Sequence, residues 1–243
     1  MDIKKIYNEK GFVIIKNLIP EEKILNVRSS LELFKRSNKY YYTQSNHTWV
    51  RSSKVSKKGY LIDSIQTPTK QKNCGNLKLA VEDTISCTQI SKILETISGE
   101  KEFINWQNML FDKSTGTLDH ADTWYLDTKP RGEMIAAWIA LEDIHVDAGR
   151  FFVYPESHKL NIAENINNKI KDHYEYAKFI NEYIQKHNLK KYAPRLKQGD
   201  VLFWHPFTIH GSWNQKSEQY SRKSLTAHYH PVGAQRMDSA ENQ

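Results

Sequence analysis

Short apolar segments separated by turn residues fill the second half of the chain, and they restrict the possible folds more than any other feature. Such segments lie at 103–111, 118–122, 133–141, 150–154, 200–205 and 224–229. Strands of this length and spacing are typical of an all-β sandwich or barrel. β-rich folds often reach roughly 200–250 residues undivided, and this 243-residue chain shows no internal repeat or Pro-rich linker. We therefore expect one domain over residues 1–243.

The first hundred residues have a more helical pattern. Residues 11–16 predict a short buried strand, Pro20 then opens a helix, and a second helix is expected over about 84–98, ended by Gly99. The polar segment 37–80 predicts a loop, and either this loop or a helical insertion at about 160–190 could act as a lid. One further helix is expected near 172–187. These patterns predict a helical part over about 1–100 and a strand-rich core over about 101–243, with a helical insertion over about 160–190.

Composition excludes several classes of protein. A hydrophobic fraction of 39% with 9 Phe, 6 Trp and 13 Tyr is too apolar for a disordered chain. The longest apolar run, residues 134–141, is far shorter than the roughly 18 residues of a membrane span. No secretion signal opens the sequence, so we expect a cytosolic protein in which Cys74 and Cys87 are ordinary thiols.

The net charge of +7 comes from basic residues that are scattered along the chain. Nucleic-acid binding would need Lys and Arg clustered in a stripe with exposed aromatic residues, and the sequence has no such stripe. We therefore expect no nucleic-acid partner. The charge suits an anionic small molecule equally well.

Two histidines and one aspartate carry the strongest chemical signal. His120 and Asp122 are two residues apart at the end of a predicted strand, where side chains at i and i+2 project to the same side. His210 ends a distant segment, residues 201–210, that is expected to be a strand, and it precedes Gly211 and Ser212. Two His and one carboxylate, with open positions left on the metal, are typical of non-haem Fe(II) oxygenases, whereas zinc usually takes four ligands.

Three other residues predict the surroundings of such a metal. Arg222 follows His210 by twelve residues, at the start of the last strand, which we expect to return antiparallel after a turn at 211–221. Its guanidinium suits bidentate capture of the carboxylate of a 2-oxo acid, and Ser212 could add a hydroxyl donor. Trp138 shares a strand face with two alanines, which leaves room for a guest, although it could equally be a core tryptophan.

Taken in order, these motifs are familiar. The segments GFVIIKNLIPEEKI, HAD, AAWIALEDIHVDAGRFFVYPESHK and GDVLFWHPFTIHGSWNQ, with a trailing arginine, cover most of the chain. The chain thereby resembles the phytanoyl-CoA dioxygenase family of Fe(II)/2-oxoglutarate-dependent oxygenases. It departs from the family pattern at two positions: Arg150 stands where the family often has the proline of Gly-Pro, and Glu156 stands where it often has the glycine of Pro-Gly-Ser-His.

The resemblance implies a mainly β fold with flanking helices, the double-stranded β-helix or cupin-like jelly roll. It implies iron ligation by His120, Asp122 and His210, and 2-oxoglutarate contacts from Arg222, Ser212 and Trp138. Asn108 lies in the strand that also approaches 2-oxoglutarate in the family, with Gln107 or Met109 taking that place after a one-residue slip. His158, His205, His228 and His230 are expected to be structural.

These residues lead to two hypotheses about the function of the chain. The first is an oxygenase that uses Fe(II), 2-oxoglutarate and O₂, releases succinate and CO₂, and hydroxylates an unactivated C–H bond. Related halogenases carry Gly or Ala at the position of Asp122, so the carboxylate favours hydroxylation, with epimerisation, desaturation or ring formation open to the same chemistry. Lys129, Arg131 and Arg150 suggest a small acidic or phosphorylated substrate, or an acyl group on a carrier or coenzyme.

The second hypothesis is a non-catalytic jelly-roll protein that binds a carbohydrate or an anion. In that case Trp124, Tyr125 and Trp213 would stack on a sugar. The two hypotheses differ in whether the chain needs Arg222 and consumes O₂.

Overall fold

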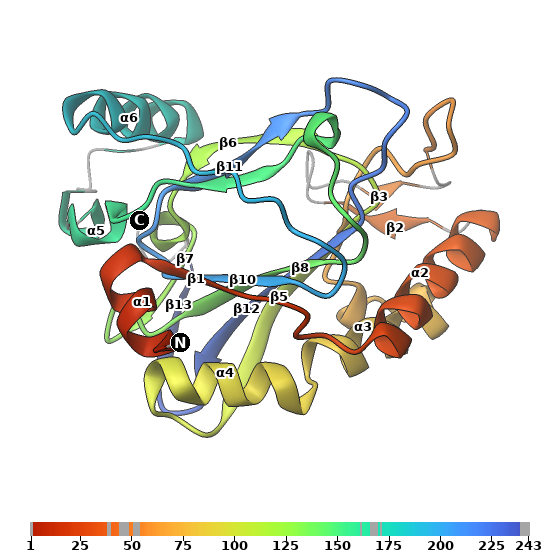
Figure 1. Cartoon of the computed structure of the whole chain (residues 1–243), viewed down its shortest axis with the longest axis horizontal. Coiled ribbons are helices and arrows are strands. Elements are labelled where there is room, and N and C mark those ends of the chain that lie inside the picture. Colours follow the sequence, from red (N-terminus) through yellow and green to blue (C-terminus); the bar gives the residue numbers. More distant parts are fainter. Residues whose placement is uncertain are drawn as a thin grey trace.

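A computed structural model describes residues 2–37, 40–43, 49–50, 54–160, 162–165, 170 and 172–238. Two facing antiparallel sheets form its centre (Figure 1). The larger sheet has the order β1 (Phe12–Ile15), β10 (Val201–Trp204), β8 (Ile135–Ala140), β12 (Ser224–Pro231), β5 (Phe103–Phe111) and β4 (Ile65–Gln66). The smaller sheet has the order β6 (Thr115–His120), β11 (His210–Asn214) and β9 (Phe151–Val153). This arrangement is a jelly roll, as predicted.

Alternation along β8 separates the two faces of the larger sheet. Ile135, Ala137 and Ile139 belong to the cluster that includes the helices, whereas Ala136, Trp138 and Ala140 pack with Phe151 and Val153 of the smaller sheet. The predicted face of Trp138 and its two alanines is therefore the inner one. Small residues on this face leave space between the sheets.

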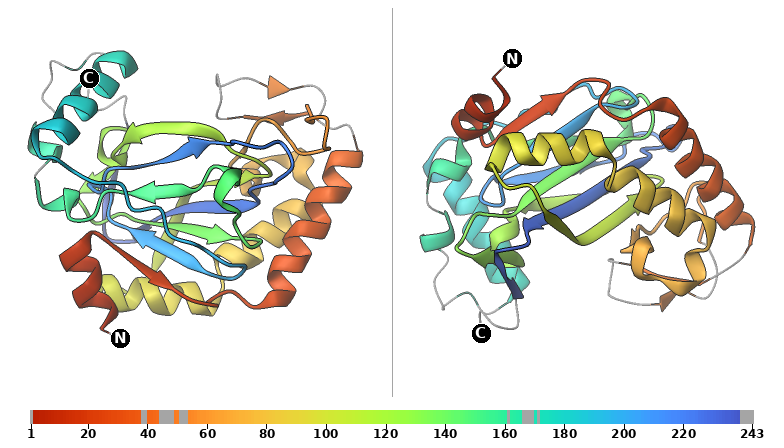
Figure 2. Two further views of the ribbon diagram at one scale, coloured as in Figure 1. Left: turned by 45° about the horizontal axis from the view of Figure 1, so that its top comes forward. Right: turned by 90° about the horizontal axis from the view of Figure 1, so that it is seen from below.

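Helices cover the outer face of the larger sheet (Figure 2). They are α1 (Ile3–Lys10), α2 (Glu21–Arg36), α3 (Asn76–Ile85) and α4 (Thr88–Ser98). Each directs buried apolar residues into one cluster with the sheet. The first hundred residues also supply both edge strands, since β1 pairs with β10 and β4 pairs with β5.

The predicted insertion consists of α5 (Ile162–Asn165) and α6 (His173–Lys186), which lie at one end of the two sheets (Figure 1). Two small ribbons complete the strands: β7 (Leu126–Lys129) with β13 (Gln235–Asp238), and β2 (Tyr41–Tyr42) with β3 (Trp49–Val50). Short 3₁₀ turns lie at Pro68–Lys70, Lys72–Cys74, Asp122–Trp124, Val146–Ala148 and Ser157–Leu160.

Several local expectations were wrong. The helix expected over 84–98 is two helices, because Cys87 is extended (φ −67°, ψ 151°) and caps the second of them. The loop expected over 37–80 holds β2, β3, β4 and half of α3, while residues 38–39, 44–48 and 51–53 lie outside the described part. His210 begins a strand of its own instead of ending β10.

The chain also crosses between sheets where we expected a hairpin. β11 pairs with β6 and β9, but β12 pairs with β5 and β8. The segment 215–223 therefore carries the chain from the smaller sheet to the larger one. Arg222 reaches the interior at the end of this crossing, and not through antiparallel return beside His210.

A buried cluster of charged side chains holds the end of this crossing, where the segment 215–223 meets β12. Asp112 is 2% exposed; its Oδ2 accepts a hydrogen bond from Lys35 Nζ at 2.9 Å, and its Oδ1 forms an ion pair with Lys223 Nζ at 3.0 Å. The Asp112 carbonyl accepts the backbone N–H of Arg222 at 2.9 Å. One aspartate thus links α2, the end of β5 and the start of β12.

Within the described residues, none of the helices combines the length and apolar character needed to traverse a bilayer. Cys74 and Cys87 are buried thiols that are not joined in a disulfide. The cytosolic location stays a prediction.

Candidate active site

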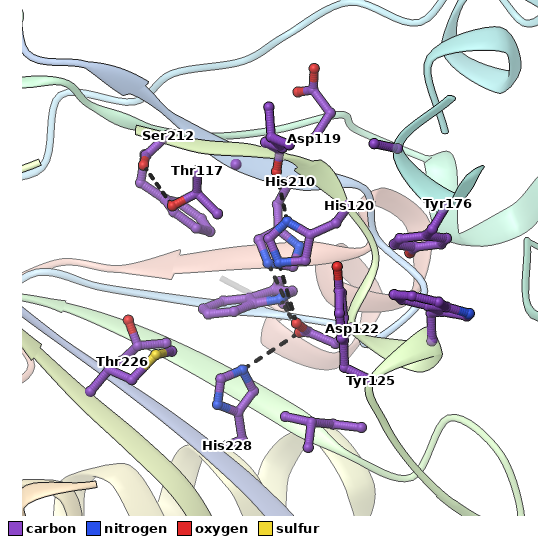
Figure 3. Close-up of a pocket in the computed structure, with 18 of the residues that line it drawn as sticks. Thr117, Asp119, His120, Asp122, Tyr125, Tyr176, His210, Ser212, Thr226 and His228 are labelled. Atoms are coloured by element: carbon purple, nitrogen blue, oxygen red, sulfur yellow. Dashed lines mark hydrogen bonds and ion pairs between the residues drawn. The ribbon is translucent and has the colours of Figure 1, made fainter. Parts of the chain in front are cut away.

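A cavity of about 860 Å³ lies between the two sheets (Figure 3). Its walls come from the larger sheet, the smaller sheet, residues 122–126, and α6 with two residues that precede it. The insertion therefore covers the cavity as expected of a lid, whereas the described residues of 37–80 do not line it. Residues from the larger sheet include Trp138, Thr226 and Met109, which are paired in register across β8, β12 and β5.

His120, Asp122 and His210 converge on one point in this cavity. His120 ends β6, His210 begins β11, and the two are direct partners in the sheet. Ala121 is extended (φ −115°, ψ 141°), so His120 and Asp122, the first residue of the 3₁₀ turn, project to the same side. Asp122 Oδ1 lies 3.8 Å from His120 Nε2 and 3.6 Å from His210 Nε2, and all three donor atoms lie within 4.8 Å of one another.

Backbone carbonyls orient both imidazoles. His120 Nδ1 lies 2.7 Å from the carbonyl of Leu118, and His210 Nδ1 lies 2.9 Å from that of Thr208. A carbonyl only accepts hydrogen bonds, so each Nδ1 carries the proton and each Nε2 presents a lone pair to the cavity. Burial lowers the pKa of His210 to about 3, which keeps this imidazole neutral and able to bind a metal.

The two oxygens of Asp122 face different partners. Oδ2 accepts Trp204 Nε1–H at 2.9 Å and lies 3.7 Å from His228 Nε2, which leaves Oδ1 directed at the two histidines. Burial raises the pKa of Asp122, but attraction from His210, His228 and His120 outweighs it, so the pKa lies below its ordinary value. The carboxylate is therefore ionised and oriented.

His228 was expected to be only structural, and the structure places it in the cavity against Asp122 (Figure 3). Strand alternation supplies the signal once Thr226 is known to face the cavity. Thr226 and His228 alternate along β12 on one face, and both line the cavity. A histidine two residues beyond a cavity-facing threonine had to face the cavity as well.

Arg222 lies at the other end of the cavity, 3% exposed, with its guanidinium carbon 4.8 Å from the Phe111 ring and 5.7 Å from the Trp138 ring. Burial lowers its pKa to about 10, so it stays charged at neutral pH. Its buried Nε has no hydrogen-bond partner among the described residues. A buried cation with an unused donor fits an anionic ligand.

Ser212 and Trp138 also line the cavity, as expected, and the Ser212 hydroxyl donates to Thr117 Oγ1 at 3.1 Å. Asn108 does not. It is fully buried on the opposite face of β5, where its amide donates to Thr69 and Asn105. Strand alternation brings Gln107 and Met109 to the cavity instead, so the expectation for Asn108 needs correction by one residue.

The basic residues expected near the substrate lie elsewhere. Lys129, Arg131 and Arg150 do not line the cavity. Among the described residues, its Asp, Glu, Lys and Arg side chains are Asp119, Asp122, Asp172 and Arg222. The argument for an anionic substrate is therefore lost. Trp124 and Tyr125 do line the cavity, with Trp124 stacked on Tyr176 of α6 at 4.3 Å, whereas Trp213 packs against Phe152.

A jelly roll with two imidazoles, a carboxylate and a buried arginine between its sheets has the features of a non-haem iron oxygenase. Residues 7–224 match the sequence profile of phytanoyl-CoA dioxygenase (PhyH). The chain belongs to this family. It is similar to the peroxisomal phytanoyl-CoA dioxygenase of Homo sapiens, with 25% identity over 250 residues that cover 94% of this chain and 68% of the relative.

Solved structures share the fold. The non-haem α-ketoglutarate-dependent carbocyclase SnoK from nogalamycin biosynthesis has 20% identity and a TM-score of 0.68, with 96% of this chain and 84% of that chain covered. EctD from S. alaskensis, solved with 2-oxoglutarate and 5-hydroxyectoine, has 16% identity and a TM-score of 0.65, with coverage of 94% and 75%.

Family membership makes the protein a non-haem Fe(II)/2-oxoglutarate-dependent dioxygenase that acts on a small molecule. Its cofactors are Fe(II) and 2-oxoglutarate, with O₂ as co-substrate. The residues present fit these groups, because neutral Nε2 atoms suit iron and the buried Arg222 suits a dicarboxylate. A non-catalytic binding protein is thereby set aside.

Proposed function

We propose that His120, Asp122 and His210 hold the iron and that the enzyme hydroxylates an unactivated C–H bond of its substrate, with release of succinate and CO₂. The observation that carries the proposal is the convergence of the two Nε2 atoms and Asp122 Oδ1 within 4.8 Å. Every other polar atom of these side chains is turned to a different partner.

Two nitrogens and one oxygen on one side of a metal leave positions for co-substrate and O₂. Bound Fe(II) and 2-oxoglutarate supply the oxidising chemistry itself. The role of Arg222 would be to pair with the distant carboxylate of 2-oxoglutarate, with the Ser212 and Thr117 hydroxyls beside it. Trp138 and Phe151, stacked at 5.8 Å, wall this part of the cavity against water.

The insertion protects the opposite side. Tyr176 of α6 is fully buried, and its hydroxyl donates to the Ala121 carbonyl at 2.7 Å and accepts the Ala121 N–H at 2.9 Å. Tyr125 Oη lies 2.6 Å from His173 Nδ1, a second link to α6. These contacts tie the cover to the turn between two of the proposed ligands and exclude water from the site.

Hydroxylation is the reaction that the carboxylate of Asp122 supports best, since it leaves no ligand position for a halide. Some structural relatives are named as an epimerase and a carbocyclase. The mass of the product therefore has to decide which type of reaction this enzyme catalyses. Mass spectrometry of substrate turned over under ¹⁸O₂ should show a product with one added oxygen atom from O₂. A product of unchanged or two-hydrogen-lower mass would replace hydroxylation by epimerisation or by desaturation or ring closure.

The ligand assignment is tested with two matched variants. Asp122→Asn removes a proposed ligand charge, whereas Asp119→Asn makes the same change three positions away, on a carboxylate that pairs with Lys191 at 3.1 Å. Titration calorimetry with Mn(II), a redox-inert substitute, should show tight binding to wild type and Asp119→Asn and loss of binding in Asp122→Asn. Equal Mn(II) binding by both variants would refute the assignment.

A further inference from the structure

A second cavity, of about 570 Å³, lies outside the active site. Its lining residues come from the β2–β3 ribbon, from the end of β4 and from the two 3₁₀ turns that precede α3. The β2–β3 ribbon is at the opposite end of the molecule from α6 (Figure 1). The cavity is thus separate from the side of the active site that the insertion covers.

Three aromatic rings form one wall of this cavity. Trp49 contacts Tyr40 at 5.6 Å between ring centroids and Tyr42 at 5.4 Å, both with steep interplanar angles. Trp49 is 57% exposed and Tyr40 53% exposed. Exposed indole and phenol rings at the wall of a cavity provide flat apolar surface for a ligand to pack on.

The polar side of the cavity has unused hydrogen-bonding capacity. Gln66 Oε1 and Asn73 Nδ2 are buried without a hydrogen-bond partner among the described residues, and both residues line the cavity. A buried polar atom without a partner is costly, so such atoms are rare unless a ligand completes them. The pair consists of one acceptor and one donor.

Neighbouring groups hold this side rigid. Gln71 is 7% exposed, and its amide donates to the Tyr42 and Gln66 carbonyls and accepts the Tyr42 N–H at 3.0 Å. Lys70 Nζ donates to the Trp106 carbonyl at 2.8 Å. The aromatic wall and the amide wall are thereby joined through Gln71, which preorganises the space between them.

The chemistry of these two unpaired atoms selects the ligand. An ionised carboxylate cannot donate to Gln66 Oε1, and an ammonium cannot accept from Asn73 Nδ2. A hydroxyl group does both, and a sugar ring carries several hydroxyls around faces that pack on aromatic rings. We propose that this cavity, defined by Tyr40, Tyr42, Trp49, Gln66 and Asn73, is a binding site for a neutral sugar ring.

The sheet register places this site next to the catalytic cavity. Gln66 pairs directly with Met109 of β5, and paired side chains lie on the same face of a sheet. Met109 lines the catalytic cavity. The sugar site is therefore one strand further out on the inner face, although it requires neither iron nor 2-oxoglutarate.

Saturation-transfer NMR on the metal-free protein tests the site, with methyl glucoside, methyl galactoside and methyl mannoside as probes. At least one should receive saturation at its ring protons. Trp49→Ala should weaken its binding about tenfold, through loss of stacking and buried area. Trp213→Ala removes another exposed tryptophan, outside the cavity, and should leave the binding unchanged.

A second variant separates binding from folding. Gln66→Leu removes a buried acceptor that has no partner, so the melting temperature should stay equal or rise, while glycoside binding falls at least as far as in Trp49→Ala. Absence of transfer to all three glycosides would overturn the proposal. Transfer that persists equally in Trp49→Ala, Gln66→Leu and Trp213→Ala, or binding of sugar phosphates alone, would overturn it as well.

Discussion

Trp204→Phe should weaken metal binding without touching a proposed ligand. Trp204 is 1% exposed, and its Nε1–H donates to Asp122 Oδ2 at 2.9 Å. A hydrogen bond to a charged group contributes about 1.5–3 kcal/mol, which corresponds to roughly 10- to 150-fold in affinity. Loss of partners that orient metal ligands typically costs about 10–100-fold. We therefore expect the Kd for Mn(II) to rise by about 10–100-fold.

The matched control is Trp213→Phe, the same substitution at a residue that is 42% exposed and packs on Phe152. Calorimetric titration of both variants with Mn(II), in the presence of 2-oxoglutarate, measures the effect directly. Circular dichroism melting of the metal-free proteins confirms that both are folded at the assay temperature. A Trp204→Phe protein that is folded and binds Mn(II) with wild-type affinity would refute the reasoning that this indole orients the carboxylate.

Three further outcomes are expected. Burial, and to a lesser degree His158, lowers the pKa of His205 to about 3, so below about pH 6.5 the unfolded state binds more protons and stability falls with acidification. In His205→Asn, whose Oδ1 can still accept the Phe207 N–H, the free energy of unfolding should fall by about 1–2 kcal/mol less than in wild type between pH 7 and pH 5. Urea unfolding at both pH values measures this, and an equal fall in the two proteins would contradict it. Asp112→Asn removes the buried charge that Lys35 and Lys223 share, while Lys35 keeps Glu32 at 2.7 Å and Lys223 keeps Glu142 at 3.8 Å. The free energy of unfolding should fall by about 1.5–3 kcal/mol, and a change below about 0.5 kcal/mol would contradict a stabilising role of this charge. Tyr176→Phe leaves the N–H and carbonyl of Ala121 without the tyrosine hydroxyl, so the free energy of unfolding should fall by about 1–3 kcal/mol and hydrogen exchange in α6 should become faster. Unchanged exchange would mean that the tyrosine does not anchor the insertion.

Local sequence patterns were enough to predict the jelly roll and much of the candidate site. Period-two alternation identified the inner face of Trp138, and the i, i+2 spacing predicted that His120 and Asp122 lie on the same side. These predictions succeeded because each depends on the conformation of a few consecutive residues. The inclusion of His210, 90 positions from His120, rested instead on the chemistry of a two-histidine, one-carboxylate ligand set, to which the family resemblance was then added.

The wrong expectations concern arrangements that local patterns do not encode. Asn108 and Gln107 are neighbours on β5, so a shift of one residue exchanges the faces on which they lie. Apolar residues occur on both faces of this strand, and hydrophobicity therefore does not show which face is the inner one. The crossing from β11 to β12 looks like a hairpin when only the turn residues are considered. The absence of Lys129, Arg131 and Arg150 from the cavity lining follows from the placement of their loops, which spacing from the HAD motif does not determine.

The architecture divides the cavity into parts that should tolerate change differently. Proposed ligands lie on the smaller sheet and its turn, Arg222 enters with the larger sheet, and the cover comes from α6. A substitution in either sheet shifts paired neighbours, because each strand there is held by register on at least one side. α6 is attached to the site mainly through Tyr176 and Tyr125, so its other cavity-facing positions can change without moving the metal-binding atoms. Substrate selectivity is therefore expected to reside in the insertion and not in the strands that carry His120 and His210.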